Sequence, residues 1–289
     1  MKTVNFFIVG APKAGTTSLY HYLNEYSEIE MSSLKEPNFF SDKALQDQKL
    51  YYKKKRIKTI EEYHALFEKD GKVLRGEASV SYLFYNDVPK SIFKYNSSAK
   101  IIIMIRNPID RAFSHYLMDY NLGLIKDSFD EIVYNLSKDD KANLFFQQYI
   151  ELGQYTKQIK RYKEVFPKDN IYIVDYDDFK NETSTVVHNI TKFLGVVQNP
   201  NYDFSKKHNI YRTPRNVIIR NIYSFPIIRQ FLSRFLSDEF RHLFKNLLFH
   251  SDTKPKISEK TRHYLKQHFD HDIRLLSKLL NKDFTKWTK

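Results

Sequence analysis

Two glycines near the start of the chain have the spacing of a loop that binds phosphate groups. Gly10 and Gly15 are separated by four residues and lie between an apolar run and a segment with helical spacing. Such glycines let backbone N–H groups close around an anion, and the N-terminus of the following helix adds its partial positive charge. The second glycine is followed by three hydroxyl-bearing donors, Thr16, Thr17 and Ser18. The pattern predicts a binding loop for a phosphate-like anion.

The lysine of this loop does not stand where a nucleoside-triphosphate loop has it. A Walker A loop continues Gly-Lys-Ser/Thr, so that the lysine reaches the β- and γ-phosphates and the hydroxyl binds Mg²⁺. Here Thr16 takes that place, and Lys13 lies inside the loop, three residues earlier. A lysine in this position can lie over the bridging oxygen of a 5′-phosphosulfate, which needs no metal. A chance glycine-rich turn is the alternative, and Pro12 and the hydroxyl run argue against it.

A second cation follows a second apolar run. In Lys100-Ile-Ile-Ile-Met-Ile-Arg106 the arginine leaves the expected strand at the edge where open α/β sheets bind ligands. Ser114 lies two turns into the helix expected next, and an arginine fork with a hydroxyl suits a lone phosphate. We expect Arg111, in the same helix, to make a structural salt bridge.

These two segments resemble the donor-binding motifs of a known family. Ala11-Pro-Lys-Ala-Gly-Thr-Thr-Ser-Leu19 is similar to the 5′-phosphosulfate loop of sulfotransferases that use 3′-phosphoadenosine-5′-phosphosulfate (PAPS), and residues 100–116 are similar to their 3′-phosphate segment. The resemblance implies that Arg106 and Ser114 bind the 3′-phosphate. It also implies that the phosphosulfate is bound by Lys13, Ala14, Gly15, Thr16, Thr17 and Ser18.

A basic loop, Lys206 to Arg215, matches the family less closely. In the family, a loop at this place in the chain closes over the adenosine and the 3′-phosphate with a basic residue. Lys207, Arg212 and Arg215 are the candidates here, and we take Arg212 and Arg215 as donor-binding residues. A plain solvated basic loop is the alternative for each of them.

A carboxylate about 20 residues after the first loop is the candidate general base. Glu36 stands in Ser33-Leu-Lys-Glu-Pro-Asn-Phe-Phe40, and partial desolvation beside two aromatics would make it a better base. The segment resembles the Lys-Glu-x-x-Phe-Phe stretch of the heparan-sulfate-type branch, where the matching glutamate is the base. That implies an in-line displacement in which Glu36 takes the acceptor's proton and Lys13 neutralises the leaving oxygen. A helix cap or a pair with Lys35 is the alternative for Glu36.

One segment departs from that branch. Arg75-Gly-Glu-Ala-Ser-Val-Ser-Tyr82 lies where the branch carries Glu-Lys-Thr-Pro-x-Tyr, so Ala78 replaces a lysine that contacts the reacting centre. Either Lys13 acts alone or another cation, such as Lys35, contributes. Glu77 is either a second acidic group in the cleft or a strand-end carboxylate paired with Arg75, and we expect the pair.

The elements that must position these residues alternate between strands and helices. Apolar runs predict strands at 4–9, 29–31, 73–76, 101–105 and 171–174. Helical spacing follows at 113–120, 155–166 and 187–194, with Gly195 as a C-cap. The order predicts an α/β fold with a mainly parallel central sheet, a P-loop-like phosphosulfate loop and flanking helices.

The last part of the chain has a different pattern. From Arg220 to His250 there is no strand signal, and another helix is expected from about Ser258 to beyond Leu280. We predict one domain over 1–289, with an α/β core at 1–215 and a helical C-terminal layer at 216–289. The basic aromatic segment 225–249 is expected to pack on the core, and peripheral contact with a membrane surface is the alternative.

The composition limits the partners and the compartment. The 47 Lys and Arg against 34 Asp and Glu give a formal charge of +13, which attracts anionic cofactors or polymers; we expect no nucleic acid. The chain has no cysteine and no histidine pattern for a metal, so no metal site is expected. No apolar run is long enough to span a membrane, and no signal peptide is recognised, so we expect a cytoplasmic protein.

The sequence is thus identified as that of a PAPS-dependent O-sulfotransferase, a bacterial member near the carbohydrate branch. The expected acceptor is a carbohydrate hydroxyl, with an acidic polysaccharide as one form of it. A P-loop-type kinase of a small metabolite is an alternative, which the missing Gly-Lys-Ser/Thr opposes. A non-catalytic binder of an anionic polymer is another, and only the +13 charge supports it.

Overall fold

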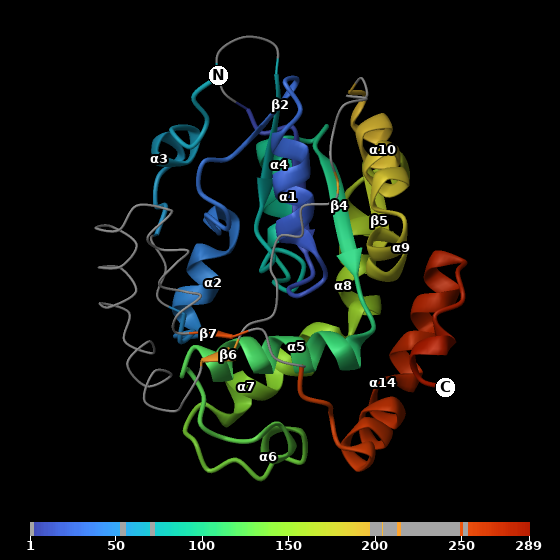
Figure 1. Cartoon of the computed structure of the whole chain (residues 1–289). Coiled ribbons are helices and arrows are strands. Elements are labelled where there is room, and N and C mark those ends of the chain that lie inside the picture. The colour runs from blue at the N-terminus through green and yellow to red at the C-terminus, as the bar shows by residue number, and fades with distance from the viewer. Residues whose placement is uncertain are drawn as a thin grey trace.

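A parallel sheet of five strands forms the centre of the molecule (Figure 1). The computed structural model describes residues 3–52, 56–69, 73–196, 204, 213–214, 249–250 and 254–289. The strand order is β2-β3-β1-β4-β5, and every pairing between neighbours is parallel. The strands are β1 (Phe6–Gly10), β2 (Ile29–Met31), β3 (Leu74–Ala78), β4 (Lys100–Ile105) and β5 (Ile171–Asp175). All five expected strands and the α/β class are confirmed.

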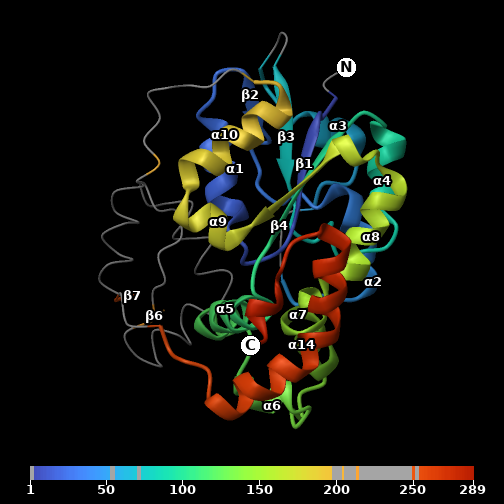
Figure 2. The same ribbon diagram turned by 90° about the vertical axis from the view of Figure 1, so that its right-hand side faces the viewer.

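The strands form where apolar runs can be covered on both faces. All five residues of β1 and all but the first of β4 are buried, which is typical of central strands in a parallel sheet. Helices α1, α9 and α10 cover one face, and α4 and α8 cover the other (Figure 2). The carboxyl end of β4 points toward α5, which lies across this end of the sheet (Figure 1).

The helices of the α/β part follow the strands as expected. Their bounds are α1 (Thr16–Asn24), α2 (Asp42–Asp47), α3 (Ile60–His64), α4 (Val88–Tyr95), α5 (Pro108–Asn121), α6 (Phe129–Val133), α7 (Ala142–Tyr149), α8 (Tyr155–Val165), α9 (Tyr176–Asn181) and α10 (Thr183–Leu194). The C-cap of α10 is Gly195 at φ 81°, which confirms the expected left-handed cap.

The C-terminal region is described in part. Helix α14 (Glu259–Leu280) begins after Ser258, whose Oγ accepts from the Thr261 N–H at 3.2 Å, so the expected helix is confirmed. No strand was expected between Arg220 and His250, and this is wrong for the last two of these residues. They form β7 (Phe249–His250), which pairs antiparallel with β6 (Thr213–Pro214). Most of the proposed helical layer before residue 254, including 225–248, lies outside the described residues, and the single-domain division stays a prediction.

Among the helices that the structure describes, none is both long and apolar enough to cross a membrane.

Candidate active site

The phosphate loop connects β1 directly to α1, as the glycine spacing predicts. Gly15 is the N-cap of α1 and has φ 90°, a conformation that side chains rarely adopt. A Cβ on Gly10 would lie 2.7 Å from the Leu83 Cβ, so close packing explains the first glycine. The two glycines thus hold the loop tightly against its neighbours, with the N-terminus of α1 at its end.

Lys13 lies in this loop, and its buried ammonium group contacts a weak hydrogen-bond acceptor. Its backbone has φ 66°, and its Nζ lies 3.5 Å from the Met118 Sδ, a weak acceptor. Burial lowers the pKa of Lys13, whereas the charges of Asp119 and Glu36 raise it. No carboxylate within the described ranges forms an ion pair with Lys13. A buried ammonium of this kind suits an incoming anion.

Arg106 lies beside the same loop, at the carboxyl end of β4. Its Nη1 donates to the Lys13 carbonyl oxygen at 3.0 Å, and its guanidinium lies 4.5 Å from the centre of the Tyr176 ring. The Tyr155 hydroxyl donates to the Arg106 carbonyl oxygen at 2.9 Å. The structure therefore brings Lys13 and Arg106 together from segments far apart in the sequence.

The remaining donor-site candidates have different outcomes. Thr16 is buried, while Thr17, Ser18 and Ser114 are half-buried, the last of them on α5. Their contacts with a ligand stay predictions. Arg212 and Arg215 lie outside the described residues.

Arg111 is structural, but its expected salt bridge is wrong. It is fully buried, and its Nη2 donates to the carbonyl oxygens of Gln148 and Tyr149 at 3.2 and 2.5 Å. Because α5 packs against α7, the backbone carbonyls at the end of α7 take the place of a carboxylate.

The Glu36 segment has an unusual backbone and is fixed to β3. Glu36 and Asn38 have φ values of 60° and 55°, a conformation that is rare for residues other than glycine and is often found at functional sites. The Glu36 N–H donates to the Ala78 carbonyl oxygen at 2.9 Å, and the Asn38 N–H donates to the Ser79 Oγ at 3.0 Å. These bonds hold the candidate base in place from the backbone.

Glu36 also carries the ion pair that was its alternative role. Lys35 Nζ lies 2.9 Å from Glu36 Oε1, and both side chains are about one-fifth exposed, at 20% and 21%. The charges of Lys35 and Glu36 both act on Lys13, and a role for Lys35 as a second cation stays a prediction. Ala78, which replaces the branch's lysine, is completely buried.

Glu77 is buried behind this segment, and its expected pairing with Arg75 is wrong. Arg75 Nε instead lies 3.3 Å from Glu30 Oε2 on the neighbouring strand. Glu77 Oε2 accepts from the hydroxyls of Tyr63 and Tyr82 at 2.8 and 3.0 Å. Burial, with a smaller effect of the Glu36 charge, raises the pKa of Glu77 to about 7.

Two charged residues of the site were missed by the sequence reasoning. Asp119 on α5 is fully buried beside the Lys13 contact, and its signal was an acid among apolar positions four residues after His115. Lys254 lies just before α14, with its Nζ 5.8 Å from the Phe113 ring centre. Burial and the charge of Arg106 lower the pKa of Lys254 to about 8. No sequence signal joins Lys254 to the loop, because only the fold brings them together.

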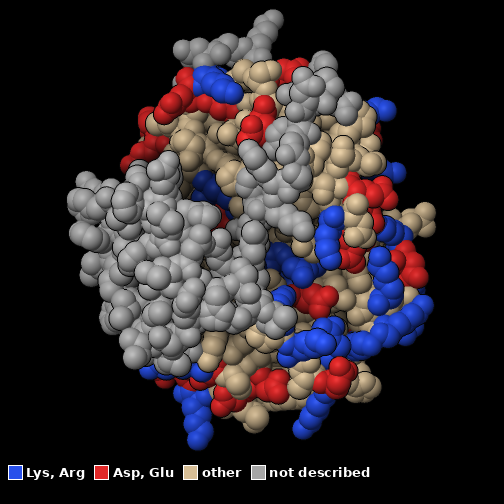
Figure 3. Space-filling model, in the orientation of Figure 1, with Lys and Arg blue, Asp and Glu red and all other residues tan. Residues whose placement is uncertain are grey.

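Basic side chains gather around a hollow on the face that Figure 1 presents (Figure 3). The positive charges of Arg106, Lys13 and Arg262 all lower the pKa of Lys254, and the charge of Asp110 raises it. Among the described residues, no group of three or more His, Asp or Glu side chains is arranged to hold a metal ion.

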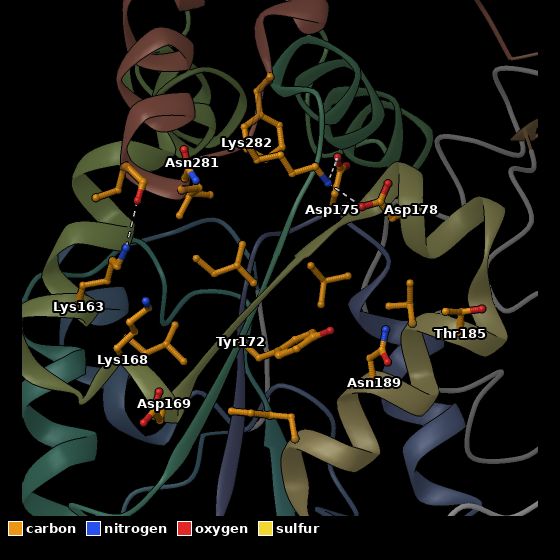
Figure 4. A pocket seen from close by; sticks show the side chains of 18 of the residues that line it. Lys163, Lys168, Asp169, Tyr172, Asp175, Asp178, Thr185, Asn189, Asn281 and Lys282 are labelled. Atoms are coloured by element: carbon orange, nitrogen blue, oxygen red, sulfur yellow. Dashed lines mark hydrogen bonds and ion pairs between the residues drawn. The ribbon is translucent and has the colours of Figure 1, made fainter.

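A separate groove of about 910 Å³ runs along the outer edge of β5 (Figure 4). Lys282 lies at one end of it, where its Nζ is 3.2 Å from Asp175 Oδ2 and 2.6 Å from Asp178 Oδ2. Lys163 and Tyr172 line its other parts. None of the donor- or acceptor-site candidates that the structure describes lines this groove.

Comparison with known proteins agrees with the motifs. A family model described as "Sulfotransferase domain" matches residues 4–271. Mouse carbohydrate sulfotransferase 15 is 24% identical over 244 residues, covering 66% of this chain and 44% of that protein. Human bifunctional heparan sulfate N-deacetylase/N-sulfotransferase 3 is 26% identical over 208 residues, covering 70% of this chain and 23% of that protein. The chain therefore spans less than half the length of each of these two relatives.

Solved structures share the fold. The crystal structure of a sulfotransferase from Alicyclobacillus acidocaldarius has a TM-score of 0.71 and 27% identity, and the match covers 100% of both chains. A mouse sulfotransferase complexed with PAP has a TM-score of 0.50 at 16% identity, with 99% of this chain and 87% of that chain covered. Both comparisons agree with the parallel five-stranded sheet described above.

Proposed function

The chain belongs to the sulfotransferase family, and on this premise we propose that it transfers a sulfuryl group from PAPS to a hydroxyl group of a carbohydrate. One observation carries the proposal. The ammonium of Lys13 is buried, forms no ion pair within the described ranges and is influenced by the charge of Glu36, while Arg106 bonds to the same loop. These contacts and charges support a site in which Lys13 serves the donor and Glu36 serves the acceptor.

The donor half follows from the cations. Lys13 and the N-terminus of α1 would bind the phosphosulfate, and Arg106 would bind the 3′-phosphate with its guanidinium fork. The Tyr176 ring, whose centre lies 4.5 Å from the Arg106 guanidinium, supports the fork through a cation–π contact. Ser114, Arg212 and Arg215 are proposed as further ligands of the 3′-phosphate.

The transfer itself is a single in-line displacement. The Glu36 carboxylate takes the proton of the acceptor hydroxyl, and the freed oxygen attacks the sulfur. The bond between the sulfur and the bridging oxygen breaks, and the electron pair stays on the departing 5′-phosphate of adenosine-3′,5′-bisphosphate (PAP). Lys13 neutralises that charge, and Lys35 can assist because it already contacts Glu36.

A carbohydrate acceptor is supported by the relatives and by the net charge. Both curated relatives above are named for sulfation of carbohydrates, and the formal charge of +13 favours an acidic polysaccharide. A carboxylate base suits a hydroxyl acceptor, because an unactivated hydroxyl is a poor nucleophile until its proton is removed. We therefore propose O-sulfation rather than N-sulfation.

Labelled PAPS and matched glycans test this function. Purified protein is incubated with ³⁵S-PAPS and two oligosaccharides of the same backbone, one with free hydroxyls only and one with free glucosamine amines. We expect label on the first, and its loss in Lys13→Ala and Glu36→Gln, whereas Lys163→Ala in the β5 groove stays active. Transfer that survives both site substitutions would refute the mechanism, and transfer only to the amine would refute the acceptor. Mg²⁺-dependent turnover of ATP would instead support a kinase.

A further inference from the structure

A buried aspartate lies next to the ammonium of Lys13, and the proposed mechanism does not use it. Asp119 follows Met118, whose Sδ contacts the Lys13 Nζ at 3.5 Å, and Asp119 has no exposed surface. Of all the charged groups that act on Lys13, Asp119 has the largest effect. The chain therefore places an acid near the cation of the donor loop, on the helix that this cation contacts.

Three hydroxyl groups converge on one oxygen of this carboxylate. Asp119 Oδ2 accepts from Tyr51, Tyr52 and Tyr149 at 2.8, 2.5 and 2.7 Å. Burial raises the pKa of Asp119 to about 6, and the hydrogen bonds donated by the three tyrosines oppose this shift, so the carboxylate is ionised at neutral pH. The other oxygen, Oδ1, is buried and has no hydrogen-bond partner.

Two other basic side chains lie near Asp119 in the described part of the chain, His115 and Arg111. His115 Nε2 lies 4.0 Å from Asp119 Oδ2, but it contacts the Tyr52 hydroxyl at 2.8 Å. Burial and the neighbouring Arg111 charge lower the pKa of His115 well below its ordinary value, so this imidazole is neutral. Arg111 contacts the Nδ1 of this ring at 3.4 Å, and its Nη2 donates to the carbonyl oxygens of Gln148 and Tyr149 rather than to Asp119. Among the described residues, Lys13 is the cation whose charge acts most on Asp119.

We propose that Asp119 is a positioning residue of the donor site, whose carboxylate keeps Lys13 protonated before the donor binds. The proposal rests on the donor-binding role of Lys13. Without the donor, a buried ammonium is costly and tends to lose its proton. A carboxylate that cannot reach the ligand, because tyrosines hold it in place, supplies the opposite charge without competing for the ligand's position.

Several charged groups share this site, and the test must separate them. Those that act on Lys13 come from α5, from the end of β4 and from the segment after β2, namely Asp119, Arg106, Glu36 and Lys35. Lys254, before α14, acts on it as well. A variant in which only Asp119 is changed isolates the effect of this carboxylate.

The first test measures Lys13 directly and needs no donor. Lysines are reductively ¹³C-methylated, and the Lys13 resonance, assigned with Lys13→Arg, is titrated by NMR. We expect Asp119→Asn to lower the pKa of Lys13, and Tyr52→Phe to lower it less, because Tyr52 helps to keep Asp119 ionised. The control is Asp272→Asn, because Asp272 is a partly buried acid that accepts from the Thr156 N–H and, in the described part of the chain, is not among the charges that act on Lys13. An unchanged Lys13 titration in folded Asp119→Asn would overturn the proposal.

The second test measures the affinity for PAP by calorimetry from pH 6 to pH 9. The anion needs charged Lys13, so its affinity falls as the pH rises through the pKa of that lysine. In Asp119→Asn the affinity for PAP should begin to fall at a lower pH. At alkaline pH the variant should lose about tenfold in affinity for each unit by which the pKa of Lys13 is lowered. At pH 6 the variant binds at least as well as the native protein. A uniform loss at every pH would assign Asp119 a structural role only. Failure of the native protein to bind PAP would refute the donor site itself and leave the NMR comparison standing.

Discussion

Glu77→Gln gives a prediction whose size follows from burial. The Glu77 carboxyl is completely buried, and its pKa is raised from an ordinary 4.5 to about 7. Below pH 4.5 the group is protonated in both the folded and the unfolded chain. As the pH rises, the unfolded chain ionises first, so the folded state loses stability until about pH 7. At about 1.4 kcal/mol for each unit of pKa difference, the loss amounts to about 3 kcal/mol.

In Glu77→Gln an amide replaces the carboxyl group, so no proton is lost at this position as the pH rises. The amide oxygen can still accept from Tyr63 and Tyr82, and any cost of the new amide group is the same at every pH. The free energy of unfolding of Glu77→Gln, relative to the native protein, should therefore rise by about 3 kcal/mol between pH 4.5 and pH 8. For a chain of this size that corresponds to a gain of roughly 6 °C in relative melting temperature.

Thermal melts at half-unit steps of pH test the reasoning. Glu131→Gln is the control, because Ser128 hydrogen bonds lower the pKa of that exposed carboxyl and its removal gives no gain as the pH rises. In a Glu36→Gln background the pH window for Glu77 should move down, since the Glu36 charge raises the pKa of Glu77. A difference between Glu77→Gln and the native protein that stays constant from pH 4.5 to pH 8 would refute the account of this carboxyl.

Three further changes test other parts of the site. Arg106→Lys removes the planar fork over Tyr176, so the affinity for PAP, measured by calorimetry, should fall by about tenfold or more. The affinity for 5′-AMP should change little, because 5′-AMP lacks the 3′-phosphate. Lys254→Ala should weaken PAP binding a few-fold at pH 7 but not at pH 9.5, because Lys254, with a pKa of about 8, is neutral at pH 9.5. An equal loss of affinity at pH 7 and pH 9.5 would contradict a role of the Lys254 charge. Gly15→Ala places a side chain at φ 90° and 3.1 Å from the Tyr176 ring, so urea unfolding should show a loss of about 1–3 kcal/mol, and no loss would contradict the assigned loop geometry.

The sheet was predictable because most of its strands are short apolar runs, and the central strands β1 and β4 are buried on both faces. Such runs are visible in the sequence at β1, β4 and β5, and even the three-residue β2 was found. The β6–β7 pair was missed because two residues carry no periodicity. It joins positions that only the complete fold brings together.

The site was predictable where a motif carries it and not where packing decides. The loop geometry places Lys13 and Arg106 together, as their positions at the ends of two strands imply. Arg75 and Glu77 share one face of β3, but they do not pair with each other. Arg75 pairs with Glu30, which lies opposite it in the parallel ladder, and Glu77 accepts hydrogen bonds from tyrosines. Asp119 and its three tyrosines come from α5, α7 and the segment before residue 53, and no local pattern shows that they converge.

The most direct test of the account is calorimetry of PAP against ATP, each with and without Mg²⁺. A lysine inside the loop and a separate arginine for a 3′-phosphate predict that PAP binds without metal, that ATP binds more weakly, and that Lys13→Ala and Arg106→Ala each reduce the affinity for PAP. Mg²⁺-dependent binding of ATP, with no heat on addition of PAP, would contradict the donor site.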